Sequence, residues 1–210
     1  MYVKYSMTKN PFTVSPDGTI AEAMEIMRSN NVRRIPVLKG GRLVGIVTER
    51  KLLEVSPSPA TSLSVFEINY LLSKTKIQDV MTKNVITVNP DTLIEEAAVL
   101  MRDNDIGALP VLEDGVLVGI ITETDIFDSF LDIMGYRDSG ARLEIEVPEN
   151  RPGVLEKLAG IMNKFNANIS HMVFYNKSTI VVRIETRETK EIVRAIEESG
   201  QKVLSVKYFD

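Results

Sequence analysis

Two residues in the second half of the chain have the types and spacing to bind a phosphorylated sugar. Thr122 ends an apolar run, and Asp125 follows it in the segment GIITETDIF. If a helix begins after Thr122, its free N–H groups attract anions and the threonine adds a hydroxyl donor. A carboxylate accepts paired hydrogen bonds, which suits the two hydroxyls of a ribose. The same pattern is also typical of a helix cap that binds nothing.

The segment that contains these residues is the second copy of an earlier one. Residues 3–53 align with residues 77–127 at a constant offset of 74 without gaps, and 24 of the 51 positions are identical. Unbroken register over this length indicates a duplicated structure. The copies differ at the acidic position, because the first copy has Lys51 where the second has Asp125.

Each copy has the pattern of a β-α-β-β-α unit. A short strand (12–14 or 85–88) leads through a Pro-Asp turn into a helix with apolar residues at helical spacing, and Thr19 is placed to cap the first such helix. Two apolar runs around glycine turns at 40–41 and 114–115 predict a hairpin, and a second helix closes the unit. We expect the two units to pack sheet to sheet around a pseudo-twofold axis.

The rest of the chain divides into a connection and a further domain. The apolar spacing within residues 61–76 predicts a short amphipathic helix that packs on the pair, and glycines and charges at 135–140 predict a domain boundary. Residues 141–210 follow the order βαββαβ, which is ferredoxin-like. The predicted fold class is therefore α/β (α+β), with domains at 1–60, 61–76, 77–135 and 141–210.

A nucleotide site in the cleft between the copies would need a flat apolar slot for a base. Val85, Ile106, Gly107 and Ala108 could supply this slot beside Asp125, if the short strand and the start of the hairpin flank the cleft.

The first copy offers a different chemistry at the equivalent place. Thr48 keeps the hydroxyl, but Lys51 cannot accept hydrogen bonds from a ribose. With Arg50 and Arg34, Lys51 could instead bind phosphate charge. The alternative is that these basic side chains form a solvated face.

The duplicated segment resembles a CBS domain pair, also called a Bateman module. The resemblance rests on MTKNVITVNPDT, IGALPV and GIITETD. It implies binding of an adenosine compound (AMP, ADP, ATP or S-adenosylmethionine) and regulation of an attached or partner protein. It further implies that Asp125 contacts the ribose, Thr122 the phosphate side, and Val85 with Ile106–Ala108 the base. Because Lys51 departs from the pattern, we expect one competent site and one altered or vacant site.

The C-terminal segment resembles an ACT domain, such as the serine-responsive domain of phosphoglycerate dehydrogenase. The phrases ENRPGVL and NANIS carry this resemblance, which implies that Asn150, Gly153 and Asn168 contact an amino acid. Pro148 stands where that family has a ligand histidine, and His171 is expected at a strand surface or an interface. From spacing alone, the alternative is that the two asparagines are turn and strand-edge residues.

Two CBS repeats followed by an ACT domain also resemble the acetoin-utilisation protein B family of bacteria, and the phrase SPSP in the connection is similar to it. This resemblance implies a regulatory protein, with acetoin metabolism as its setting. CBS pairs and ACT domains commonly pair through symmetric faces, so a homodimer and a regulated partner protein are expected by resemblance.

Composition excludes several kinds of chemistry and makes some partners unexpected. With no cysteine and one histidine among 210 residues, disulfides, thiolate chemistry and multi-histidine metal sites are excluded, and we expect a cytoplasmic protein. A net charge of −4 without a basic tract makes nucleic acid an unexpected partner. No apolar run reaches the roughly 18–20 residues that span a bilayer.

Catalysis is not expected from these residues. There is no Ser/His/Asp or Cys/His set and no phosphate-binding glycine loop of the known patterns, so no catalytic residue, metal or cofactor is predicted. Two other classes stay open beside a ligand-sensing regulator. One is a structural or adaptor protein whose repeats bind no ligand, and the other is a carboxylate-based nucleotide hydrolase.

Overall fold

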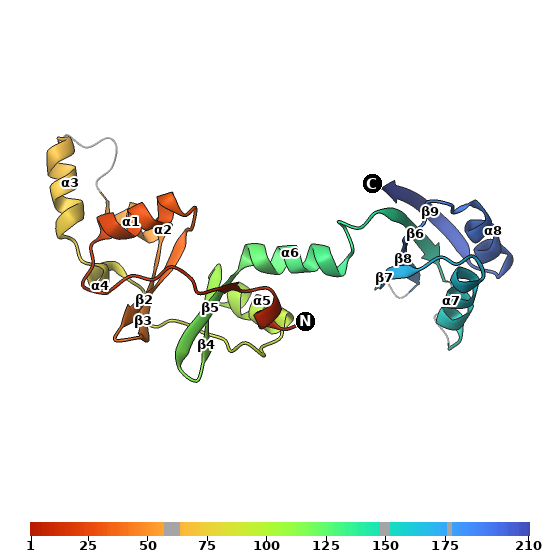
Figure 1. Cartoon of the computed structure of the whole chain (residues 1–210), viewed down its shortest axis with the longest axis horizontal. Coiled ribbons are helices and arrows are strands. Elements are labelled where there is room, and N and C mark those ends of the chain that lie inside the picture. The colour runs from red at the N-terminus through yellow and green to blue at the C-terminus, as the bar shows by residue number, and fades with distance from the viewer. Residues whose placement is uncertain (57–63, 148–151, 176–177) are drawn as a thin grey trace. The chain divides into compact units, whose positions relative to one another are not determined.

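A computed structural model of the chain describes residues 1–56, 64–147, 152–175 and 178–210. The chain divides into two units, Met1–Ile126 and Phe127–Asp210, so that the division falls inside the helix α6 (Glu123–Ile133) (Figure 1). The glycines at 135–140, where the sequence indicated a boundary, follow this helix directly. Within the described residues, no helix is both long and apolar enough to cross a membrane.

The first unit contains both copies of the repeat, and each copy forms a β-hairpin with a helix before and after it, as predicted (Figure 1). The first copy consists of α1 (Ile20–Ser29), β2 (Arg34–Lys39), β3 (Arg42–Thr48) and α2 (Glu49–Val55). The second consists of α5 (Ile94–Asp103), β4 (Ala108–Glu113), β5 (Val116–Thr122) and α6. The other elements are η1 (Val3–Tyr5), β1 (Thr8–Lys9), α3 (Val65–Lys74) and α4 (Ile77–Val80).

Local sequence signals account for these elements. The predicted hairpin turns occur where backbone φ is positive at consecutive residues, at Gly40-Gly41 and at Asp114-Gly115. Two such residues in a row give the turn that matches the twist of the strands. Thr19 caps α1 through a reciprocal capping box with Glu22. The predicted connecting helix is α3, in which Leu72 packs against the core while Leu71 is exposed; the side chain of Val65 lies outside the described residues.

The short strand predicted at the start of each copy is not formed. It is reduced to a single parallel bridge, from Val14 to Val37 in the first copy and from Val88 to Val111 in the second. Residues earlier in each copy pair with the hairpin of the other copy. In the first copy they form β1, which pairs with β5 of the second copy.

The two copies exchange their leading segments. Strand order in one sheet is β1-β5-β4, and Thr82 of the second copy bridges to Ile46 on β3 of the first. The apolar side chains follow the same exchange, because Val3 is fully buried in the core of the second repeat and Ile77 in the core of the first. Each repeat is therefore completed by residues of the other.

Two glycines inside strands make this exchange possible. A Cβ atom on Gly119 would lie 2.5 Å from Sδ of Met7 and 3.0 Å from the carbonyl oxygen of Thr8. Gly45 makes the same close approach to Met81 and to the next carbonyl oxygen. A glycine within a strand marks such close contacts between backbones.

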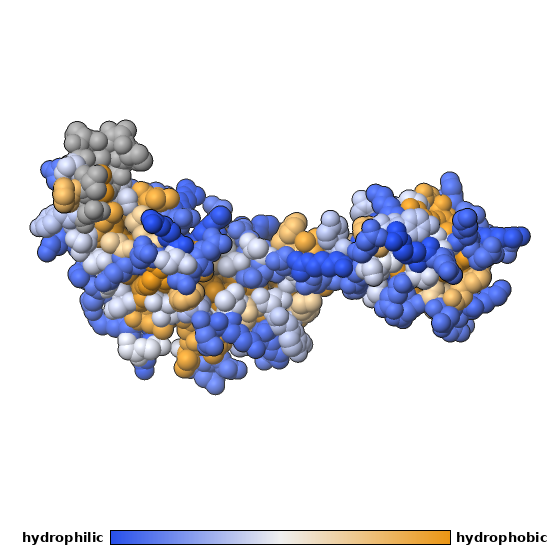
Figure 2. Space-filling view, turned by 45° about the horizontal axis from the view of Figure 1, so that its top comes forward, coloured by the Kyte–Doolittle hydropathy of each residue, from blue (hydrophilic) through white to orange (hydrophobic). Residues whose placement is uncertain are grey.

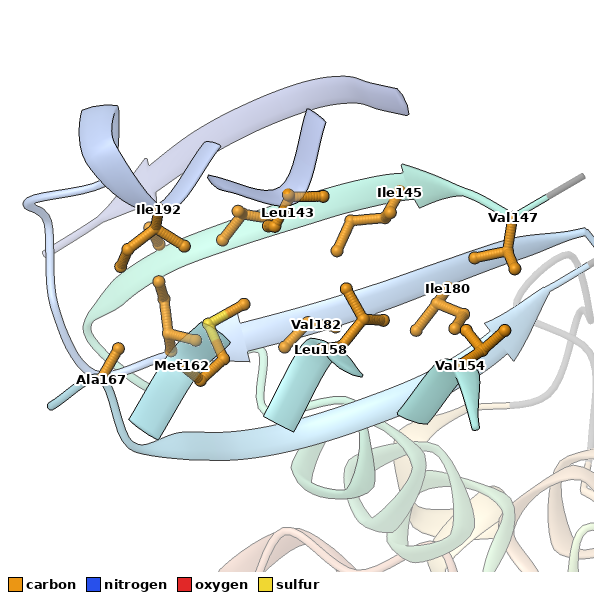
Figure 3. Close-up of a cluster of buried hydrophobic side chains, with 13 residues drawn as sticks. Leu143, Ile145, Val147, Val154, Leu158, Met162, Ala167, Ile180, Val182 and Ile192 are labelled. Atoms are coloured by element: carbon orange, nitrogen blue, oxygen red, sulfur yellow. The ribbon is translucent and has the colours of Figure 1, made fainter. Parts of the chain in front are cut away.

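The second unit has the predicted βαββαβ order. Its elements are β6 (Gly140–Glu146), α7 (Val154–Lys164), β7 (Ile169–Tyr175), β8 (Thr179–Ile184), α8 (Lys190–Glu198) and β9 (Lys202–Phe209). The strand order is β7-β8-β6-β9 with every pair antiparallel. Figure 3 shows Leu158 and Met162 of α7 pointing toward Leu143 and Val182 of the sheet, with Ile192 of α8 in the same cluster.

The single histidine lies on β7 against the segment that follows α6. Its Nδ1 is 3.0 Å from Oδ2 of Asp138, without the geometry of a hydrogen bond. A Cβ atom on Gly135, where φ is +62°, would overlap with the imidazole ring.

On the face shown in Figure 2, hydrophilic residues predominate with apolar patches between them.

Candidate functional site

The first turn of α6 brings Thr122 and Asp125 into direct contact. The backbone N–H and the hydroxyl of Thr122 both donate to Oδ2 of Asp125, at 2.8 and 2.7 Å. In return, the backbone N–H of Asp125 donates to the threonine Oγ1 at 3.4 Å. This is the helix cap that the sequence offered as the alternative to ligand binding.

The capping pair borders a cavity. Thr122 and Asp125 both line it, so a ligand inside would lie next to the hydroxyl, the acid and the start of α6 together.

This cavity has a volume of about 570 Å³, which is within the usual range for small-molecule sites. Its walls come from the β1 segment, the approach to β2, strand β5 and the first turn of α6. The lining residues are Thr8, Lys9, Asn10, Pro11, Phe12, Asn31, Val32, Arg33, Arg34, Ile120, Thr122, Thr124 and Asp125.

The cavity beside Asp125 is lined at positions of the first repeat, not at the four positions predicted for a base slot. Val85, Ile106, Gly107 and Ala108 are not among the described residues that line the cavity. Their counterparts at the offset of 74 are, namely Pro11, Val32, Arg33 and Arg34. The reason is the exchange of leading segments, which brings the first copy's β1 next to β5. The glycine inside each hairpin strand was the signal that could have indicated this close approach.

The four predicted slot residues take other places. Ile106 packs against the core of the second repeat, and Ala108 is buried and pairs with Thr122 across the hairpin. Val85 is half-buried. Gly107 accepts a hydrogen bond from the backbone N–H of Glu123 at 3.2 Å, so it marks the start of α6.

Arg34 joins this site from the first repeat. Its Nη2 lies 3.7 Å from Oε2 of Glu123, and its side chain is 30% exposed. Arg34 therefore lines the cavity and also contacts the Glu123 carboxylate in the first turn of α6.

The three basic residues that were predicted to bind phosphate in the first repeat do not lie together. Arg50 Nε and Lys51 Nζ both contact Glu54, at 3.1 and 3.3 Å, while Arg34 lines the cavity beside Asp125. The hydrogen bonds from Arg50 and Lys51 lower the pKa of the Glu54 carboxyl. The Thr48 hydroxyl caps α2 by accepting a hydrogen bond from the Lys51 backbone at 3.2 Å.

The predicted amino-acid site is described only in part. Asn150 lies outside the described residues. Gly153 precedes α7 with a left-handed φ of +94°, as a loop glycine can adopt, and Asn168 is exposed, its carbonyl accepting a hydrogen bond from Glu185. An amino-acid contact at Gly153 and Asn168 stays a prediction. Within the described ranges, His, Asp and Glu side chains form no group of three or more that could hold a metal ion.

Fold and cavity together define a duplicated α/β module in which both repeats line a cavity of small-molecule size. The chain belongs to the CBS-domain family, whose model matches residues 3–58 and 77–132, more than half of the chain. The resemblance of both copies to CBS domains is thereby confirmed. The matches end before β6, so the likeness of the second unit to an ACT domain stays a prediction.

Solved structures give the same assignment. A Vibrio cholerae protein named for acetoin utilization, AcuB, is 30% identical with a TM-score of 0.54, over 65% of this chain and 95% of that one. The CBS pair of protein MJ0100, solved with 5′-methylthioadenosine and S-adenosyl-L-methionine, is 30% identical with a TM-score of 0.51, over 62% and 95%. CBSX2, solved with AMP, is 29% identical with a TM-score of 0.53, over 63% and 98%.

Proposed function

We propose that this protein is a regulatory sensor that binds an adenosine nucleotide in the cavity beside Asp125. The observation that carries the proposal is the convergence of a helix start, a hydroxyl, an acid and a basic side chain on one cavity. These are the groups that a ribose and a phosphate require.

Each group has a role in the proposed complex. Asp125 accepts hydrogen bonds from the ribose hydroxyls, while Thr122 and the positive N-terminal end of α6 lie on the phosphate side. Arg34 contributes charge to the phosphate, with Arg33 and Lys9 also on the cavity wall. The base lies against Pro11 and Val32, in place of the second-copy residues that the sequence indicated.

Two related CBS pairs support an adenosine ligand, because one was solved with AMP and the other with 5′-methylthioadenosine and S-adenosyl-L-methionine. The basic side chains in this cavity favour a phosphorylated compound, so AMP is the first ligand to test. Since both repeats line the cavity, a bound nucleotide would stabilise one arrangement of the repeats, which is how binding could be signalled to a partner protein. A role in acetoin metabolism stays a prediction.

Thermal unfolding with and without AMP tests this proposal. AMP at about 100 times its Kd should stabilise the wild-type protein by about 2.7 kcal/mol and raise its melting temperature. The variant Asp125→Ala should lose this shift, because its cavity lacks the ribose acceptor.

Glu22→Ala is the matched control for the helix cap. Glu22 reaches back to the backbone N–H of Thr19 at 2.8 Å, as Asp125 does to Thr122, and it is not among the residues that line the cavity. Both substitutions remove the acidic partner of a capping pair and leave the threonine in place, so each should cost at most about 0.5–2 kcal/mol of stability. Glu22→Ala should keep the AMP shift. Equal shifts in all three proteins would contradict the ribose contact, and no shift in the wild type would favour the ligand-free adaptor.

A further inference from the structure

The ion pair between Arg34 and Glu123 links the two repeats at the N-terminus of α6. Arg34 belongs to β2 of the first repeat, and Glu123 is the first residue of α6 in the second. Their side chains are 3.7 Å apart and are 30% and 67% exposed. Thr122 and Thr124, on either side of Glu123, line the cavity.

The ion pair packs against the backbone of Gly107. A Cβ atom built on Gly107 would overlap with the Arg34 guanidinium and would lie 2.5 Å from Oε2 of Glu123. The guanidinium and the carboxylate therefore both rest against a position without a side chain. This geometry keeps Arg34 beside the cavity while an acid is already in contact with it.

A phosphate in the cavity and the Glu123 carboxylate would compete for the same guanidinium. If Arg34 turns to the phosphate, its contact with Glu123 is lost. If it holds both, two anions lie near each other, and like charges disfavour binding. In either case the acid reduces affinity for a ligand that carries phosphate, and it has no such effect on an adenosine compound with a neutral 5′ group.

We infer that Glu123 sets the selectivity of the cavity between phosphorylated and neutral adenosine compounds. The inference rests on the proposed function and extends it, because it names the residue that tunes ligand charge.

Isothermal titration of the full chain with AMP and with 5′-methylthioadenosine tests the inference. The variant Glu123→Gln keeps the shape of the side chain and removes its charge. We expect it to bind AMP about two- to five-fold more tightly than the wild type, the range expected for a partly exposed ion pair, and to bind 5′-methylthioadenosine with unchanged affinity.

Glu95→Gln is the control for net charge and for loss of an acid from a helix start. Glu95 lies in the first turn of α5 and is not among the residues that line the cavity, so AMP affinity should stay at the wild-type value. If the wild type binds AMP but Glu123→Gln binds it no more tightly, or binds both compounds more tightly by the same factor, the inference is overturned and the proposed function survives. If the wild type binds neither compound, both are overturned.

Discussion

At the scale of single residues, the two copies show that the acid at position 125 is not required to start a helix. The Thr48 hydroxyl caps α2 in the first copy although the residue three positions later is Lys51. In the second copy Thr122 makes the equivalent contact and Asp125 is added to it. The threonine alone therefore caps α2, and in the second copy the added carboxylate lies on the wall of the cavity, where we propose the ribose contact.

This argument predicts a specific dependence on the ribose hydroxyls. The protein should bind 2′,3′-dideoxy-AMP at least about ten-fold more weakly than AMP, because a hydrogen bond to a charged group contributes roughly 1.5–3 kcal/mol. Isothermal titration with the two nucleotides measures the difference. Equal affinities would remove the ribose contact from the account while leaving the cavity itself in place.

At the scale of elements, local signals were enough to predict the helices and hairpins. The glycine turns, the Thr19 cap and the alternating apolar residues of the second unit each act over a few neighbouring residues, so the sequence contains them directly. The pairing of β1 with β5 is not a local signal, because it joins residues more than a hundred positions apart.

The exchange of leading segments could not be read from the repeat itself. Met7 and Met81 open identical MTKN phrases, and the glycines that receive them, Gly119 and Gly45, are equivalent positions. Either phrase is therefore chemically suited to either hairpin, and the alignment gives no preference. For this reason the sequence named Val85 and Ile106–Ala108 for the base slot, whereas the cavity beside Asp125 is lined at the equivalent positions of the first copy. A base contact at either set of residues stays a prediction.

A pair of glycine substitutions tests whether the exchange builds the site. Gly119→Ala and Gly45→Ala should each destabilise the protein by roughly 1–3 kcal/mol, because each new methyl group would press on a carbonyl oxygen at 3.0 Å. Only Gly119→Ala should also weaken AMP binding, since it displaces Thr8, which lines the cavity. Chemical unfolding and titration with AMP measure the two effects. An equal loss of affinity in both variants would argue against a local effect of the exchanged segment.

At the scale of the whole molecule, the two units have separate hydrophobic cores. The first unit contains one cluster for each repeat, and the second contains a single cluster between its sheet and helices. The homodimer implied by the resemblance stays a prediction. Phe127, Phe130 and Ile133 on α6 are exposed, so apolar side chains are available for such an interface.

Photolabelling of the intact chain with 8-azido-AMP, followed by mapping of the labelled peptides, tests the central claim most directly. The account predicts a label that AMP competes away, attached within residues 8–12 or 31–34, where the base would lie. A competed label confined to residues 82–86 or 105–108, or to the second unit, would contradict it. So would the absence of any label that AMP can displace.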